Sequence, residues 1–144
     1  MTVVKIDEVT KVYEGKVTHR ALNQLSFEVE KGEFLAVMGP SGSGKTTLLN
    51  LISTIDSLTS GRVLINGINP HSLDKDELPL FRRRQLGFVF QDFNLLQMLT
   101  VEENLVLPLT LDGMPIKEME KRVQELAGRL HLQPFLHKKP NEIS

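Results

Sequence analysis

Residues 39–47 read Gly-Pro-Ser-Gly-Ser-Gly-Lys-Thr-Thr, which matches the glycine-rich phosphate-binding loop called the P-loop. Glycines let the backbone turn so that successive N–H groups converge on phosphate oxygens, and the helix that follows turns its positive N-terminus toward the same anion. Lys45 adds a full charge for the β and γ phosphates of a nucleotide, and the Thr46 hydroxyl is placed to ligate Mg²⁺. The predicted nucleotide-binding residues of this loop are Gly39, Pro40, Ser41, Gly42, Ser43, Gly44, Lys45, Thr46 and Thr47.

The residues on either side of the loop strengthen this match. Residues 34–38, Phe-Leu-Ala-Val-Met, are continuously apolar, which is typical of a strand buried on both faces of a parallel sheet. After the loop, Leu48, Leu49, Ile52 and Ile55 recur at helical spacing. A buried strand, a glycine loop and an amphipathic helix in this order are the context of a P-loop, so a glycine-rich loop without a ligand is the weaker alternative.

The rest of the pattern predicts an α/β protein that is rich in strands at its start and in helices at its end. A turn is expected at residues 31–33. Short apolar runs bounded by turn residues predict further strands at residues 3–9, 25–29, 62–66 and 86–90.

Three helices are expected after the P-loop helix. The first lies near residues 74–84, and the second begins at Thr100, which has the capping-box spacing with Glu103. Pro115 suits the first position of the third helix. The third helix carries an apolar stripe, expected to pack on the chain's own core, of Ile116, Met119, Val123, Leu126 and Leu130.

Composition and charge favour an ordinary globular domain without a nucleic-acid partner. The chain has 144 residues, 40% of them hydrophobic, and a net charge of -1, whereas nucleic-acid binding needs a concentrated basic surface. Three arginines at residues 82–84 complement the C-terminal dipole of the predicted 74–84 helix and form a solvated face, in preference to a nucleic-acid patch. Cysteine is absent, which fits a reducing compartment such as the cytosol. The four histidines show no metal-binding spacing.

Neither a secretion signal nor a membrane-spanning segment is expected. Charged residues interrupt the first nine positions, and no apolar run approaches the roughly 20 residues that cross a bilayer. Any association with a membrane is therefore expected to come from a partner.

Essentially the whole chain resembles the ATP-binding subunits of ABC transporters. Besides the P-loop, Thr-Ser-Gly at residues 59–61 with Arg-Val-Leu-Ile-Asn-Gly at 62–67 is similar to the family's turn and strand after the P-loop helix. Phe-Val-Phe-Gln at residues 88–91 resembles its Q-loop. Residues 87–96 and 99–104 are most similar to the branch that serves lipoprotein release and the export of macrolides and antimicrobial peptides.

The resemblance implies a P-loop NTPase (RecA-like) core with an N-terminal antiparallel β subdomain and the start of an α-helical subdomain, incomplete in these residues. Residues 1–91 would form the β subdomain and the first part of the core, including the Q-loop glutamine. Residues 92–144 would belong to the helical subdomain.

Two site residues outside the P-loop are implied by the resemblance. Gln91 would approach Mg²⁺ and the γ-phosphate as a sensor rather than a base, although a glutamine that only caps a strand end is the alternative. Tyr13, the only tyrosine, would stack on adenine and contribute about 1 to 3 kcal/mol, although an ordinary half-buried tyrosine is the alternative. The metal ligands would be Thr46 and Gln91, with ATP and Mg²⁺ as the cofactors.

The family's catalytic groups are expected beyond residue 144, because the chain ends Pro-Asn-Glu-Ile-Ser where the family continues into the Gly-Gly-Gln of its signature motif. No catalytic residue is assigned here, and a full-length parent is expected to hydrolyse ATP while these residues alone are not. The strand before the P-loop would also lose most of its parallel neighbours. The expected partners are ATP, permease subunits docking near residues 91–96 and a second ATP-binding subunit placed head to tail.

The leading hypothesis is therefore the energy-coupling ATPase of an exporter, held at the inner face of the cell membrane through its permease. The alternatives are an ABC-type ATPase that acts without a membrane, in repair or translation, and a short nucleotide-binding regulatory module. The transported substrate is chosen by the membrane subunits and is not predicted by this sequence.

Overall fold

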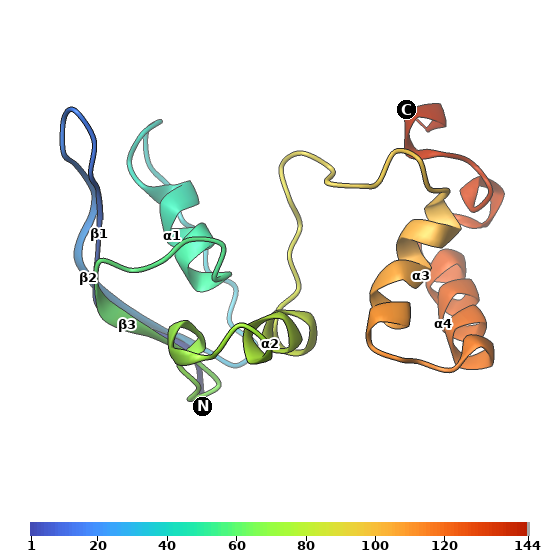
Figure 1. Cartoon of the computed structure of the whole chain (residues 1–144), viewed down its shortest axis with the longest axis horizontal. Coiled ribbons are helices and arrows are strands. Elements are labelled where there is room, and N and C mark those ends of the chain that lie inside the picture. Colours follow the sequence, from blue (N-terminus) through green and yellow to red (C-terminus); the bar gives the residue numbers. More distant parts are fainter. Residues whose placement is uncertain (144) are drawn as a thin grey trace. The chain divides into compact units, whose positions relative to one another are not determined.

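The computed structural model describes residues 1–143, which form two compact units divided between Phe88 and Val89 (Figure 1). The first unit contains β1 (Thr2–Tyr13), β2 (His19–Glu30), α1 (Lys45–Ile52), β3 (Ser60–Ile65) and α2 (Glu77–Gln85). The second contains α3 (Val101–Leu111) and α4 (Ile116–Arg129). Single 3₁₀ turns occur at Pro70–Ser72, Gln133–Phe135 and Pro140–Glu142. Among these residues, no helix is both long and apolar enough to cross a membrane.

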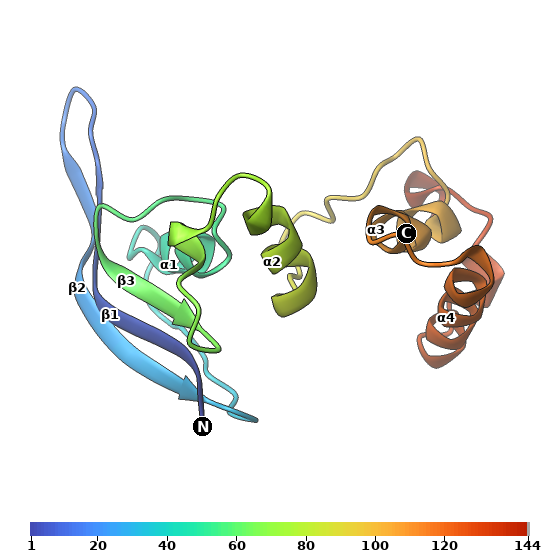
Figure 2. The same ribbon diagram turned by 60° about the horizontal axis from the view of Figure 1, so that its bottom comes forward.

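The first unit is built on an antiparallel sheet with the strand order β2-β1-β3. β1 and β2 form a long hairpin whose far end pairs Tyr13 with His19. Helix α1 packs on this sheet, as Figure 2 shows, because its buried Leu48 and Leu51 join a core with Ile6 and Val63 of the strands. The sheet therefore supports the helix that follows the P-loop.

Gly61 allows β3 to approach β1 closely. Its φ is +85°, and a Cβ there would lie 2.4 Å from the Glu8 carbonyl oxygen, so only glycine fits without a backbone shift. This position belongs to the Thr-Ser-Gly turn of residues 59–61. The turn residue is thus required by the packing of the sheet.

Helix α2 begins with two backbone N–H groups, of Asp76 and Glu77, donating to Asp74 Oδ1 at 2.9 and 2.8 Å. Near its other end, Arg82 donates from Nε to Thr54 Oγ1 at 2.7 Å and from Nη2 to the Thr54 carbonyl at 3.1 Å. The predicted arginine face at the end of α2 is solvent-exposed at Arg82, and this side chain in addition ties α2 to the segment after α1.

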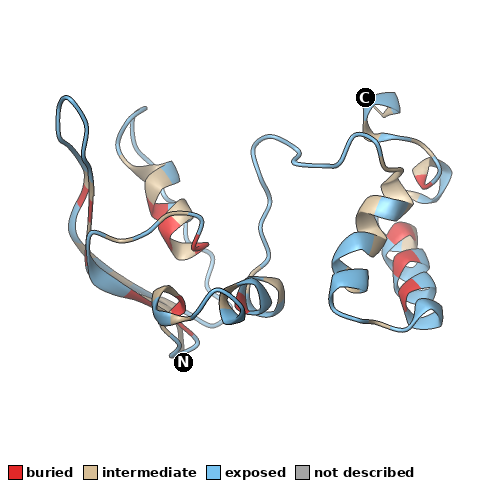
Figure 3. Ribbon diagram, viewed as in Figure 1, coloured by how far each residue is buried: buried red, intermediate tan, exposed pale blue. Residues whose placement is uncertain are grey.

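The second unit is a pair of helices with its own small core. The predicted capping box is confirmed, since the Glu103 N–H donates to Thr100 Oγ1 at 3.2 Å and the Thr100 N–H donates to Glu103 Oε2 at 2.7 Å. Figure 3 shows the buried residues of α4 on the side that faces α3. Of the predicted α4 stripe, Met119 and Val123 are buried, and Ala127 completes the core.

Three other members of the predicted stripe are exposed. Ile116 is 70%, Leu126 40% and Leu130 56% exposed, so the prediction that they pack in the core is wrong. They lie at the margin of a face that already buries Met119, Val123 and Ala127 against α3, and a helix pair covers only a narrow stripe.

Two predicted strands are absent from the described residues. Residues 34–38 and 86–90 are not strands, and Phe34, Met38 and Val89 are 95%, 87% and 98% exposed. A strand forms only where a neighbour completes its ladder. The sheet of residues 1–143 contains only β1, β2 and β3, and none of these pairs with either segment.

Candidate functional site

The P-loop and the end of the β1–β2 hairpin form one pocket of about 310 Å³ within the first unit. Predicted residues of the P-loop and of the hairpin line this pocket together, because Tyr13 lies at the end of β1 that borders the pocket. The pocket is lined by Tyr13, His19, Ala21, Ser41, Gly42, Gly44, Lys45, Thr46 and Thr47.

The Lys45 ammonium group lies against the P-loop backbone. It donates to the Gly39 and Pro40 carbonyls at 2.9 and 2.8 Å and approaches Ser43 Oγ at 3.5 Å. Backbone carbonyls are neutral acceptors, and hydrogen bonds from an ammonium group to a charged phosphate are stronger. The Lys45 ammonium is therefore held inside the loop by acceptors that a bound phosphate could replace.

Gly44 fixes how the loop enters α1. It is the N-cap of the helix in the left-handed conformation, with φ +91°. A Cβ at this position would lie 2.6 Å from the Ala21 carbonyl oxygen of β2, so the loop is pressed against the hairpin. The first N–H groups of α1 lack intrahelical partners, and its first turn has no acidic residue. This helix end is suited to an anion.

The side-chain hydroxyl of Thr46 is an oxygen ligand of the kind that Mg²⁺ prefers. Thr46 is exposed in the first turn of α1 and lines the pocket, and a hydroxyl oxygen is a suitable ligand for this hard cation. Among residues 1–143, no group of three or more His, Cys, Asp or Glu could hold a metal ion. The Thr46 hydroxyl is thus an oxygen ligand that this site could offer to Mg²⁺.

Tyr13 is held from two sides at the edge of the pocket. Its hydroxyl donates to Asp56 Oδ2 at 2.7 Å, and the Lys11 ammonium lies 4.7 Å from the centre of its ring. The residue is 40% exposed, so the ring remains accessible while its hydroxyl is bonded.

Three of the predicted P-loop residues, Gly39, Pro40 and Ser43, do not line the pocket. A further predicted site residue outside the P-loop is Gln91. It is exposed and belongs to the second unit, whereas the P-loop belongs to the first. Its role as a phosphate sensor remains a prediction.

Two pocket residues were not predicted. His19 and Ala21 lie at the start of β2, and His19 pairs directly with Tyr13. The register of the hairpin is the signal that would have found them, but a five-residue connection at residues 14–18 does not specify a register by itself.

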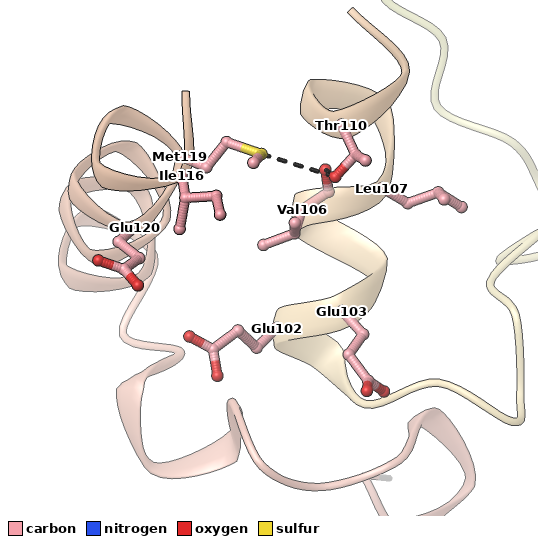
Figure 4. Close-up of a pocket in the computed structure, with 8 residues that line it drawn as sticks. All are labelled: Glu102, Glu103, Val106, Leu107, Thr110, Ile116, Met119 and Glu120. Atoms are coloured by element: carbon pink, nitrogen blue, oxygen red, sulfur yellow. Dashed lines mark hydrogen bonds between the residues drawn. The ribbon is translucent and has the colours of Figure 1, made fainter. Parts of the chain in front are cut away.

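The second unit has a pocket of about 360 Å³ between α3 and α4 (Figure 4). Val106, Leu107 and Ile116 give it an apolar wall, and Thr110 Oγ1 lies 3.5 Å from Met119 Sδ. The charged side chains that line it are Glu102, Glu103 and Glu120. An acidic rim without a cation does not suit a nucleotide.

Comparison with known proteins gives a consistent result. A family model described as "ABC transporter" matches residues 22–144. The chain is 54% identical over 141 residues to the ABC transporter ATP-binding protein YxdL of Bacillus subtilis, covering 98% of this chain and 55% of that protein. It is 42% identical over 145 residues to the bacitracin export ATP-binding protein BceA of Halalkalibacterium halodurans, covering 100% and 57%. The chain thus spans little more than half the length of these relatives.

A solved structure also matches. The dimeric post-hydrolysis state of the ATP-binding cassette MJ0796, bound to ADP and Pi, aligns with a TM-score of 0.88 and 43% identity, covering 98% of this chain and 63% of that one. The MJ0796 protein comes from Methanocaldococcus jannaschii. The fold is therefore that of part of an ATP-binding cassette.

Proposed function

This chain belongs to the ABC transporter family. We propose that it provides the nucleotide-binding part of an ATP-binding subunit, and that hydrolysis of ATP by this subunit drives export. The observation that carries the proposal is the single pocket in which P-loop residues and Tyr13 come together. One end of this pocket offers positive charge and N–H donors, and the other offers an aromatic ring. A nucleoside triphosphate carries the matching groups: anionic phosphate oxygens at one end and an aromatic base at the other.

The proposed binding mode assigns a separate task to each end of the pocket. Phosphate oxygens would accept hydrogen bonds from the loop and from the first turn of α1, and would draw Lys45 away from the Gly39 and Pro40 carbonyls. Adenine would stack on Tyr13. Binding of Mg²⁺ at Thr46 would neutralise phosphate charge and orient the γ-phosphate.

The remaining parts of the proposal concern other residues and other chains. Gln91 would act as the sensor of the metal and the γ-phosphate, and residues 91–96 would dock a permease subunit at the inner face of the cell membrane. Leu95 and Leu96 in this stretch are 44% and 52% exposed, which supports a contact surface. The name of the relative BceA, a bacitracin export ATP-binding protein, supports export, and the dimeric cassette of MJ0796 supports pairing of two ATP-binding subunits.

The test compares nucleotide binding and ATP hydrolysis between the natural protein and its Lys45→Ala variant. Loss of one ammonium contact to phosphate is expected to weaken ATP binding by about ten- to a hundredfold, because a charged hydrogen bond contributes about 1.5–3 kcal/mol. Isothermal titration calorimetry gives the dissociation constant, and phosphate release gives the rate. Lys31→Ala, in the exposed turn after β2, is the matched control. Wild-type affinity in the Lys45 variant would contradict the proposal.

A further inference from the structure

We infer that Lys11 and Asp56 form a positioning pair that holds the Tyr13 ring in place for a nucleotide base. The inference rests on the proposed nucleotide-binding function and deepens it, because it names residues outside the pocket lining that determine how the base is received. The contacts of all three side chains lie within the first unit.

Lys11 has little freedom in this arrangement. Its side chain is only 9% exposed, and its ammonium donates to Asp56 Oδ1 at 2.6 Å and to the Ser57 carbonyl at 2.7 Å. An ammonium group removed from water needs such partners, because an unpaired buried charge is strongly unfavourable. Because Lys11 is buried, it needs Asp56 as a counter-ion, and the same burial restricts the movement of both side chains.

Asp56 connects Lys11 to the aromatic ring. One carboxylate oxygen accepts from Lys11 and from the Ser57 N–H at 2.7 Å, and the other accepts from the Tyr13 hydroxyl at 2.7 Å. The hydrogen bond from Lys11 is the main reason that the pKa of Asp56 lies below its usual value; burial opposes this, and Tyr13 and Ser57 add to it. The carboxylate is thus charged at neutral pH and is a strong acceptor for the phenol.

Asp56 and Lys11 together fix the position and the accessible face of the Tyr13 ring before any nucleotide binds. The hydroxyl is tethered to Asp56, and the Lys11 ammonium lies over the ring at 4.7 Å from its centre. A cation over one face stabilises the ring and occupies that face, which leaves the opposite face for a base. The side chain then loses little freedom when a nucleotide binds, and this preorganisation favours affinity.

The pair also assigns a role to the Tyr13 hydroxyl. A phenylalanine would keep the stacking surface but would lose the tether to Asp56. If the network acts as inferred, the hydroxyl matters for binding although it does not touch the base. This expectation separates a positioned ring from a ring that only provides apolar area.

The experiment compares ATP with inorganic triphosphate, which has the phosphates but no base, in the natural protein. Tyr13→Phe and Asp56→Asn are each expected to weaken ATP binding by about three- to tenfold, the cost of immobilising one side chain. Affinity for inorganic triphosphate is expected to stay unchanged. Adding Tyr13→Phe to Asp56→Asn is expected to give little further loss, because both changes remove the charged hydrogen bond from the Tyr13 hydroxyl to the Asp56 carboxylate.

The control is Lys5→Met, which breaks the ion pair from Lys5 Nζ to Glu28 at 2.7 Å on the same hairpin but away from the pocket. It is expected to bind both ligands like the wild type. Tyr13→Phe decides the matter even if Asp56→Asn fails to fold, because it removes only one hydroxyl. Wild-type affinity of Tyr13→Phe for ATP, or equal losses for ATP and triphosphate, would overturn the inference. If Lys45→Ala has no effect on either ligand, the proposed function itself fails instead.

Discussion

Replacing Asp56 by Asn should destabilise the first unit by about 3 kcal/mol, which is roughly a 150-fold change in the unfolding equilibrium. The Lys11 side chain is 9% exposed, and this substitution would remove its counter-ion. Breaking a buried ion pair from one side costs about 3–5 kcal/mol. The lower end applies because the ammonium keeps the Ser57 carbonyl at 2.7 Å and the amide oxygen of the new residue.

The opposite change should cost less. Lys11→Met removes the charge that is hardest to leave unpaired, and the Asp56 side chain, 25% exposed, keeps the Tyr13 hydroxyl and the Ser57 N–H as donors. We expect about 1.5–2 kcal/mol for this variant, the lower end of the roughly 1.5–3 kcal/mol that a hydrogen bond to a charged group contributes. The predicted order, Asp56→Asn worse than Lys11→Met, comes from the difference in burial between the two side chains.

Urea denaturation of the natural protein gives the free energies, and hydrogen exchange of the β1 amides confirms that the loss lies in this sheet. Glu28→Gln, which breaks the exposed pair with Lys5, is the control and should leave the denaturation midpoint nearly unchanged. The reasoning is refuted if Asp56→Asn is no more destabilising than Glu28→Gln, or if Lys11→Met is the worse of the two.

Further predictions concern pH, the loop and the second unit. Because the pKa of Asp56 is lowered in the folded state, its stabilisation should be complete above the unfolded value of about 3.9 and lost as pH falls through the folded value, so acid unfolding should be steeper in the wild type than in Asp56→Asn. Gly44→Ala should weaken ATP binding more than Gly42→Ala in calorimetry, since both glycines have positive φ but only at Gly44 would a Cβ meet a backbone oxygen, at 2.6 Å. Thr100→Ala should lower the stability of α3 by about 1 kcal/mol in denaturation, whereas Thr110→Ala, whose hydroxyl caps nothing, should lower it less. Asn104→Ala should increase exchange of the Leu96 N–H, which Asn104 Oδ1 accepts at 2.9 Å, and a protected amide in that variant would contradict the assigned contact.

Local sequence patterns predicted those elements whose partners lie close along the chain. The capping box depends on Thr100 and Glu103, three positions apart, and both of its hydrogen bonds are present. The P-loop residues were predicted for a similar reason, from their spacing and from the apolar segments directly before and after them. Six of these residues line the pocket: Ser41, Gly42, Gly44, Lys45, Thr46 and Thr47.

Features that depend on distant partners were not predictable. Continuous apolar character in residues 34–38 and 86–90 indicates that a segment is suited to burial, but a strand also needs a neighbour to complete its hydrogen bonds. No described strand supplies one, and Phe34 is 95% exposed. The contact of Lys11 with Asp56 bridges 45 positions, and no periodicity in the sequence points to it.

The two ends of the proposed nucleotide site are connected through one short helix. The N-terminus of α1 carries Lys45 and Thr46, and the segment just after its C-terminus carries Asp56, which tethers Tyr13. A shift of α1 along its axis would therefore move the phosphate-binding groups and pull on the Tyr13 tether together. Leu48 and Leu51, 4% and 0% exposed, resist such a shift by packing α1 on the sheet. The core of this unit thus sets the distance between the phosphate end and the base end of the pocket.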